Sequence, residues 1–438
     1  MFKLFFSKGD RDLNTRPGSE STSLCPIPRS GLPQTTGIIL HLFLTLATAL
    51  VGIGICAMRT ISQVEVNIAE AASAVILLLL VVYLWRVTRT AKGIVPILIF
   101  AGVFLAYLTN SLIPTAVLFG LIFSVSLGST LLAVQPKKNL LWFPVIALAA
   151  YAITLAVSRD PVGSVAMLIP FPPAVVLALG TRSSAEKQDG LTRVGVICAT
   201  SLALGLSLGA MILLSAYRHL GTLEPAALTE ALEAFRLSLI DQIVSTEIPT
   251  EGLTPEALEE FKSLFSYSSV SNMVNGIFNT LPAMAVVAVN LIAATVQLIQ
   301  HAALRTFGFG ESITPRVKIY RMSLISCIVF TVAYLVALLE GSDTSTLTGT
   351  VAQNIYIILL PGLALAGMLR ITGSLARKGP RGMGCLFFVV ILIPCLLLFV
   401  PLAFAGFEVI GHIFASLTSA IKPPDDDDPF GRPPTSKD

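Results

Sequence analysis

Polar side chains recur along one face of an otherwise apolar segment that covers residues 276–303. When each residue advances by 100° around a helix axis, these side chains fall within an arc of about 100°. The residues on this face are Asn275, Asn279, Asn290, Gln297, Gln300 and His301. Side chains of these types hydrogen-bond to neighbouring helices within a membrane or line a path for a polar solute. On the sequence alone, both interpretations stay open.

Two later apolar segments carry weaker patterns of the same kind. In one, Tyr334 shares an arc of about 80° with Tyr320, Ser323, Cys327 and Thr331. The other opens with Gln353, Asn354 and Tyr356, and Pro361-Gly362 interrupts it. Proline and glycine within a membrane helix can free carbonyl groups for a ligand, although both residues are also common in such helices. The candidate solute-binding residues are therefore Asn279, Asn290, Gln297, Tyr334, Gln353 and Asn354.

No motif in the sequence indicates an enzyme active site. The His-Glu-x-x-His metalloprotease motif and the Gly-Lys-Ser/Thr of a P-loop are both absent. The run Gly205-Leu206-Ser207-Leu208-Gly209 has the residue types of a serine-hydrolase elbow, but it lies within an unbroken apolar stretch. This context favours a Gly-x-x-x-Gly helix-packing face. Six scattered cysteines predict neither a disulfide framework nor a zinc site, and no catalytic residue, cofactor or metal is expected.

The elements that position the polar residues must be long apolar helices. The chain is 54% hydrophobic and 13% charged, with a mean hydropathy of +0.81, whereas a soluble domain is about 25% charged. A bilayer offers the backbone no hydrogen-bond partners, so apolar runs of this length must span it as helices. The predicted fold is all-α, a polytopic transmembrane bundle of about eleven spans. The predicted spans are residues 36–58, 68–86, 94–108, 112–134, 140–158, 162–180, 194–217, 276–303, 319–340, 351–370 and 383–407.

The basic residues predict the orientation of these spans. If the amino terminus is cytoplasmic, 21 of the 29 Lys and Arg residues fall in cytoplasmic segments, as the positive-inside rule requires. The expected location is a bacterial cytoplasmic membrane. The last apolar region, from Met383 to Ile421, contains Pro394 and Pro401. A twelfth segment there stays open, and with it the side of the carboxyl terminus.

Three polar regions flank or divide the spans. Residues 1–35 are predicted to be a disordered cytoplasmic tail, and residues 422–438 a disordered, acidic, Pro-rich tail. Residues 218–275 form an acidic extracytoplasmic loop. This loop separates helices 1–7, in residues 36–217, from helices 8–11, in residues 276–421.

The acidic loop itself is predicted to contain two helices. Pro225 and Pro255 each stand at an early helical position, where the missing N–H of proline costs nothing. Helical spacing of apolar residues follows each proline, and in the first helix these are Leu228, Leu232, Phe235 and Leu239. The expected structure is a two-helix cap over the outer mouth of the bundle.

The stretch from Leu281 to Gly379 resembles the YybS-like family of predicted bacterial membrane proteins, a domain of unknown function. The features that carry the resemblance are Leu281-Pro282 opening a span, a basic segment through Arg316 and Arg321, and Gln353-Asn354 followed by Leu360-Pro361-Gly362 ahead of Arg377-Lys378. Such proteins look distantly similar to the substrate-binding membrane subunits of energy-coupling-factor transporters. The resemblance implies a small-molecule solute and an ATPase or coupling-subunit partner. This chain differs from those subunits in its larger number of spans and its long amino-terminal tail.

Three functional hypotheses follow, in order of preference. The first is a protein that binds or moves a small polar solute through a cavity lined by the eighth, ninth and tenth spans. The second is a non-catalytic membrane scaffold or assembly factor, in which the polar faces hold helices together, and the third is an intramembrane enzyme. Because the chain has no nucleotide-binding motif, a partner would have to supply any ATP coupling. Membrane lipids are expected partners, and nucleic acid is not.

Overall fold

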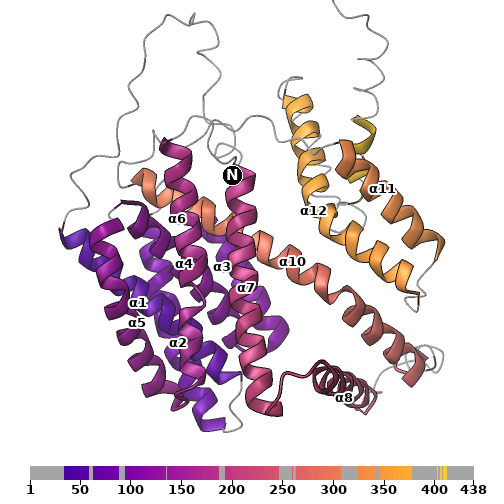
Figure 1. The fold of residues 1–438 in the computed structure, drawn as a ribbon, viewed down its shortest axis with the longest axis horizontal. Coiled ribbons are helices and arrows are strands. Elements are labelled where there is room, and N and C mark those ends of the chain that lie inside the picture. The colour runs from indigo at the N-terminus through magenta and orange to yellow at the C-terminus, as the bar shows by residue number, and fades with distance from the viewer. Residues whose placement is uncertain are drawn as a thin grey trace, which may run out of the picture. The chain divides into compact units, whose positions relative to one another are not determined.

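The computed structural model describes residues 34–58, 63–87, 94–134, 136–186, 193–245, 259, 263–306, 324–340 and 346–376, with a few residues between 402 and 411 (Figure 1). All regular elements in this described part are helices, which confirms the predicted all-α class. They are α1 (Gln34–Ala57), α2 (Gln63–Val87), α3 (Ile94–Thr109), α4 (Ile113–Val134), α5 (Pro136–Ser158), the 3-10 helix η2 (Gly163–Leu168), α6 (Phe171–Glu186), α7 (Arg193–Leu220), α8 (Pro225–Val244), α10 (Tyr267–Thr306), α11 (Leu324–Leu339) and α12 (Leu347–Ala376).

Seven helices in the described part are long and apolar enough to cross a bilayer. They are Thr36–Ala57, Ile113–Val134, Leu140–Ser158, Gly163–Arg182, Gly195–Leu220, Tyr267–Leu304 and Leu347–Ala364. Two of the other predicted spans correspond to shorter apolar helices, Val66–Val82 and Leu324–Leu339. The predicted span at residues 383–407 lies almost entirely outside the described residues. The chain therefore has the apolar helices of an integral membrane protein, while the count of about eleven stays a prediction.

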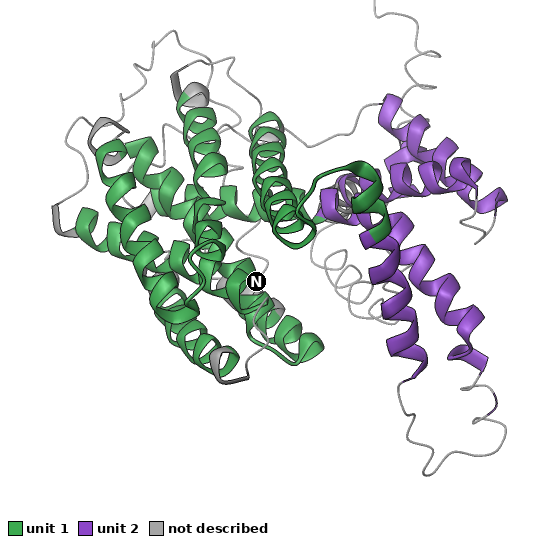
Figure 2. Cartoon of the chain, turned by 60° about the horizontal axis from the view of Figure 1, so that its bottom comes forward, with its two compact units in different colours: residues 1–230, 288–316 green, residues 231–287, 317–438 purple. Residues whose placement is uncertain are grey.

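The chain forms two compact units (Figure 2). Unit 1 comprises residues 1–230 and 288–316, and unit 2 comprises residues 231–287 and 317–438. The boundary falls inside α10, so this 40-residue helix contributes side chains to both units.

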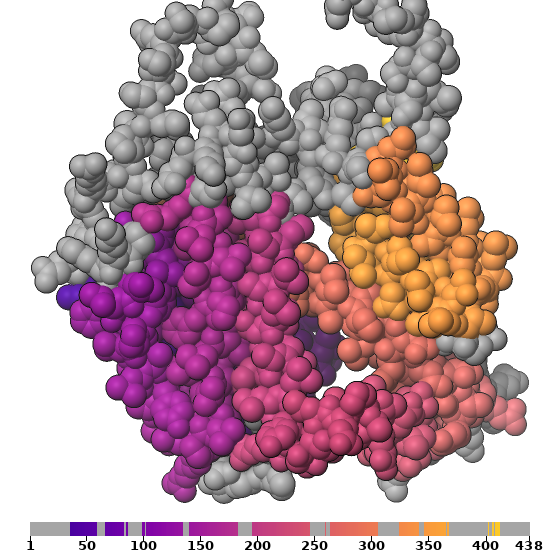
Figure 3. Space-filling view, in the orientation of Figure 1, coloured from indigo at the N-terminus to yellow at the C-terminus, as the bar shows by residue number. Residues whose placement is uncertain are grey.

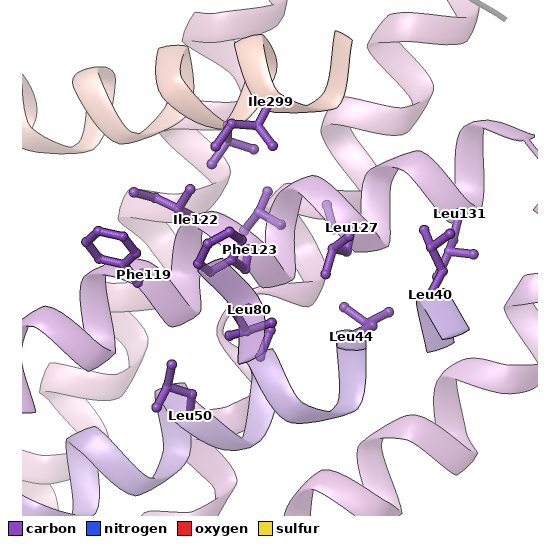
Figure 4. Packing of buried hydrophobic residues seen from close by; sticks show 14 of the residues in the cluster. Leu40, Leu44, Leu50, Leu80, Phe119, Ile122, Phe123, Leu127, Leu131 and Ile299 are labelled. Carbon is purple, nitrogen blue, oxygen red and sulfur yellow. The ribbon is translucent and has the colours of Figure 1, made fainter. Parts of the chain in front are cut away.

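The core of unit 1 forms around α4. Each residue of α4 from Leu121 to Val134 is buried, which suits a helix that is apolar all around. Side chains from α1, α2 and α10 pack against it (Figure 4). In the space-filling view, the purple and magenta helices of unit 1 lie in contact with one another (Figure 3). The packed residues labelled in Figure 4 are Leu40, Leu44, Leu50, Leu80, Phe119, Ile122, Phe123, Leu127, Leu131 and Ile299.

Small residues allow α1 and α4 to approach closely. A Cβ at Gly120 would lie 3.0 Å from the Val51 nitrogen and 3.2 Å from the Ala47 carbonyl oxygen. Gly120 belongs to a row of buried small residues spaced four apart, namely Ala116, Gly120, Ser124 and Gly128. Rows of this kind let membrane helices pack with their backbones in contact. The packing face on α4 was not predicted from the sequence.

The packing face that was predicted, on α7, is not used within the described chain. A Cβ at Gly205 or at Gly209 would meet no atom within 4 Å. The reason is that α7 turns this side outward, as the exposed Leu202 and Leu206 beside the glycines show. That part of the prediction is therefore wrong for contacts within this molecule.

Unit 2 contains most of α8, the first half of α10, and the pair α11 and α12. The predicted helix at Pro225 is confirmed as α8, whereas its predicted companion at residues 253–261 lies almost entirely outside the described residues. Ile240 of α8 packs against Val270 and Val274 of α10. Helices α11 and α12 pack around a separate small core of Cys327, Phe330 and Leu363.

Candidate functional site

The six candidate residues divide between the two units. Unit 2 holds four of them, and unit 1 holds Asn290 and Gln297. We call the unit 2 group, together with a neighbouring tyrosine, the unit 2 polar cluster; its members are Asn279, Tyr334, Gln353, Asn354 and Tyr356. All of its side chains are half-buried.

The side-chain amide of Asn354, on α12, hydrogen-bonds to two backbone groups of α10. Its Nδ2 donates to the Asn279 carbonyl oxygen at 2.7 Å, and its Oδ1 accepts from the Ala283 N–H at 3.0 Å. Asn279 O and Ala283 N are the pair that would bond to each other in a regular helix. Pro282, between them, lacks an N–H and crowds the preceding turn. The amide therefore bridges the helix where proline weakens it, and it joins α12 to α10.

Three other members of the cluster lie next to one another in a row, with Gln353 and Tyr356 on α12 and Tyr334 on α11. Gln353 lies one turn from Tyr356 along α12, near enough for its side-chain amide to interact with the tyrosine hydroxyl. The Tyr356 ring meets the Tyr334 ring of α11 edge to face, with centroids 5.8 Å apart and planes at 89°. The sequence had marked Tyr356 as polar but not as a candidate, although its three-residue spacing from Gln353 places both on one helix face.

In unit 1, Gln297 and Gln300 of α10 face inward, whereas Asn290 is half-buried. Gln297 is 3% exposed and Gln300 is fully buried, whereas Leu291, on the opposite side of α10, is 57% exposed. Thr181 of α6 donates its hydroxyl to the Gln300 side-chain oxygen at 3.0 Å. Gln300 thus serves as interhelical glue, one of the two roles considered for this face. Thr181 lies in a polar stretch at the end of its helix and had no pattern that could single it out.

An ion pair joins the ends of α5 and α7 within unit 1. Arg218 Nη1 donates to both carboxylate oxygens of Asp160, at 2.9 and 3.1 Å. A Cβ at Gly163 would overlap this carboxylate. Burial alone would raise the pKa of Asp160, but hydrogen bonds from the Gly163 backbone and from Arg218, with the positive charge of Arg218, hold the pKa below its ordinary value of 3.8.

Asp160→Asn is expected to lower the free energy of unfolding by at most about 1 kcal/mol at neutral pH, because the Arg218 side chain is 46% exposed and solvent screens the pair. A carboxyl whose pKa is lowered by folding stabilises the protein above its unfolded pKa, and it loses that effect as the pH falls through its folded value. The difference between wild type and variant should therefore begin to shrink near pH 3.8 and vanish once the pH is below the lowered pKa of Asp160 in the folded protein. Thermal unfolding followed across pH checks this, and a difference that persists in acid would contradict the assignment.

Neither metal ligation nor similarity identifies the function. Within the described residues, no three His, Cys, Asp or Glu side chains gather as a metal site would require. The chain matches no known family model, curated protein or solved structure. The candidate site must therefore be interpreted from its own geometry.

Proposed function

We propose that this chain is a multi-pass protein of a bacterial cytoplasmic membrane, with about eleven spans, that binds a small polar solute at the unit 2 polar cluster. The observation that carries the proposal is the half-burial of Tyr334, Gln353 and Tyr356 together on apolar helices. Polar groups at membrane depth need polar partners. The side-chain oxygen of Gln300 obtains its partner from a neighbouring helix, whereas the side chains of Tyr334, Gln353 and Tyr356 keep part of their surface exposed, and a solute can bind there.

The cluster suits a solute with both a ring and hydrogen-bonding groups. Tyr334 and Tyr356 offer aromatic surface at right angles to each other, and Gln353 adds an amide that both donates and accepts. Vitamins, nucleosides and aromatic amino acids have this combination. The resemblance of residues 281–379 to a family distantly similar to transporter subunits points the same way. On that basis, an ATPase or coupling subunit would supply energy if the solute is transported.

Solute binding should raise the unfolding temperature of the purified protein. A ligand at 100 times its dissociation constant stabilises the folded state by about 2.7 kcal/mol. We expect one solute class to stabilise wild type, and we expect Gln353→Leu to reduce that shift because the amide is lost. Val351→Ala is the matched control, since Val351 is exposed and lies about 160° around α12 from Gln353. Failure of all three solute classes, or equal shifts for both variants, would contradict binding at this cluster.

A membrane scaffold or assembly factor is the second candidate. Two interhelical contacts favour it, the Asn354 amide on the α10 backbone and the Thr181–Gln300 hydrogen bond. If polar side chains serve only to fasten helices, no solute changes the unfolding temperature, although the substitutions themselves lower it. The same measurement therefore separates the two candidates.

We propose that the amino terminus is cytoplasmic and that α8 is extracytoplasmic, on the charge asymmetry of the loops. In an otherwise cysteine-free protein, Glu233→Cys should react with an impermeant thiol reagent on intact cells, and Ser184→Cys should react only after lysis. Glu233 suits the test because its side chain is 49% exposed. The opposite labelling pattern would reverse the orientation.

A further inference from the structure

Helix α8 has three distinct faces. With Phe235 as zero and 100° per residue, Leu228, Leu232 and Leu239 lie between 20° and 60°, while Glu230, Glu233 and Asp241 lie between about 160° and 240°. Ile243 and Ile240, at about 80° and 140°, pack on α10, and the half-buried Leu239 joins them there. Leu232 and Phe235 remain 55% and 61% exposed. An apolar face thus stays uncovered beside the packed one, opposite the carboxylates.

The chain holds the start of α8 close to the end of a membrane-spanning helix. Helix α7 ends at Leu220, where Gly221 adopts φ 72° and donates its N–H to the Tyr217 carbonyl oxygen at 2.8 Å. Pro225 opens α8 five steps later, so α8 begins within about 18 Å of the end of α7. At 1.5 Å per residue, α7 is roughly 42 Å long and reaches beyond the hydrocarbon core of about 30 Å. The start of α8 therefore lies near the membrane surface.

The exposed face of α8 also adjoins apolar surface on α10. The Phe235 ring lies 6.2 Å from the ring of Phe278, on the spanning helix. Next to Phe278, Ile277 is 49% exposed. Leu232 and Phe235 therefore extend a surface that already belongs to a membrane helix.

We propose that α8 is an interfacial helix whose Leu228, Leu232 and Phe235 face lies among lipid headgroups and upper acyl chains, with its carboxylates in water. All three carboxylates of α8 lie on the side away from this face, which suits an element in the plane of the interface, although the apolar Leu237 and Val244 also lie on the carboxylate side. The α8 face carries no cluster of basic residues that would attract anionic lipids. Burial of apolar surface drives the binding, so zwitterionic phosphatidylcholine suffices.

Quenching of tryptophan fluorescence by brominated lipid tests whether this face of α8 lies in the membrane interface. In the full chain, Trp85→Phe and Trp142→Phe remove both native tryptophans. Each variant then carries one tryptophan reporter, Phe235→Trp, Leu232→Trp or Leu237→Trp. Each is reconstituted in phosphatidylcholine vesicles, once with bromine on the acyl chains and once without. Leu237 is the matched control, because it is 47% exposed and lies only two residues from Phe235, about 200° around the helix. We expect the reporters at 232 and 235 to be quenched at least about twofold more than the reporter at 237.

Three results would overturn the proposal. One is equal quenching at 235 and 237, and another is stronger quenching at 237. The third is unquenched but blue-shifted emission at 235, which would mean that protein covers this face, from another part of this chain, a second copy or a partner. The two on-face reporters protect against a single misfolded variant, and an unchanged unfolding temperature verifies each. The proposal is independent of solute binding at the unit 2 polar cluster.

Discussion

Gly120→Ala should lower the free energy of unfolding by about 1–3 kcal/mol, and larger side chains at this position should lower it further. The added Cβ would stand 3.0 Å from the Val51 nitrogen and 3.2 Å from the Ala47 carbonyl oxygen. Both atoms belong to the backbone of α1, so neither can turn away as a side-chain end could. Relief requires α1 and α4 to separate, and their separation would loosen the central packing of unit 1.

Gly205→Ala provides the control for this substitution. It makes the same chemical change in another apolar helix, but its Cβ would meet no atom within 4 Å. We expect its free energy of unfolding to stay within about 0.5 kcal/mol of wild type. Thermal or denaturant unfolding in detergent measures both variants. Equal losses would show that the close approach of α1 and α4 is not what Gly120 provides.

Asn354→Ala should lower the free energy of unfolding by about 1–3 kcal/mol, because a side chain that bonds to two helices is removed. Its amide donates to the Asn279 and Thr350 carbonyl oxygens at 2.7 and 2.8 Å and accepts from the Ala283 N–H at 3.0 Å. Water does not readily replace these bonds at membrane depth. Val351→Ala, on the exposed side of α12, should cost less.

A double-mutant cycle of Asn354→Ala with Pro282→Ala tests whether Asn354 stabilises α10 by compensating for its proline. Alanine restores the N–H that proline lacks and allows α10 to regain a regular ladder, so the Ala283 N–H and the Asn279 carbonyl oxygen can pair with each other. Asn354→Ala should then cost less in the Pro282→Ala background than in wild type, by at least about 0.5 kcal/mol. Strictly additive losses would mean that Asn354 does not compensate for the proline.

Local features of the sequence predicted the helices and the inward face of α10 well. Apolar runs must be helical in a bilayer because each backbone group needs a partner within its own segment. For the same reason, two amides of α10, Gln297 and Gln300, turn inward and are buried. Pro225 begins α8 as expected because its missing N–H falls where the helix does not use it.

The sequence alone determined that this chain is a set of apolar helices with polar faces, because those properties depend on composition and on the spacing of neighbouring residues. Only the tertiary structure decided which polar groups meet. Thr181 and Gln300, which hydrogen-bond to each other, are 119 residues apart in the sequence. Asn354 is 75 residues from Asn279, to whose carbonyl oxygen it donates. It also decided that α4, not the Gly205–Gly209 face, supplies the tight packing. Helical periodicity fixes the face on which a residue lies, but the neighbour of that face is set by how separate helices pack their surfaces together.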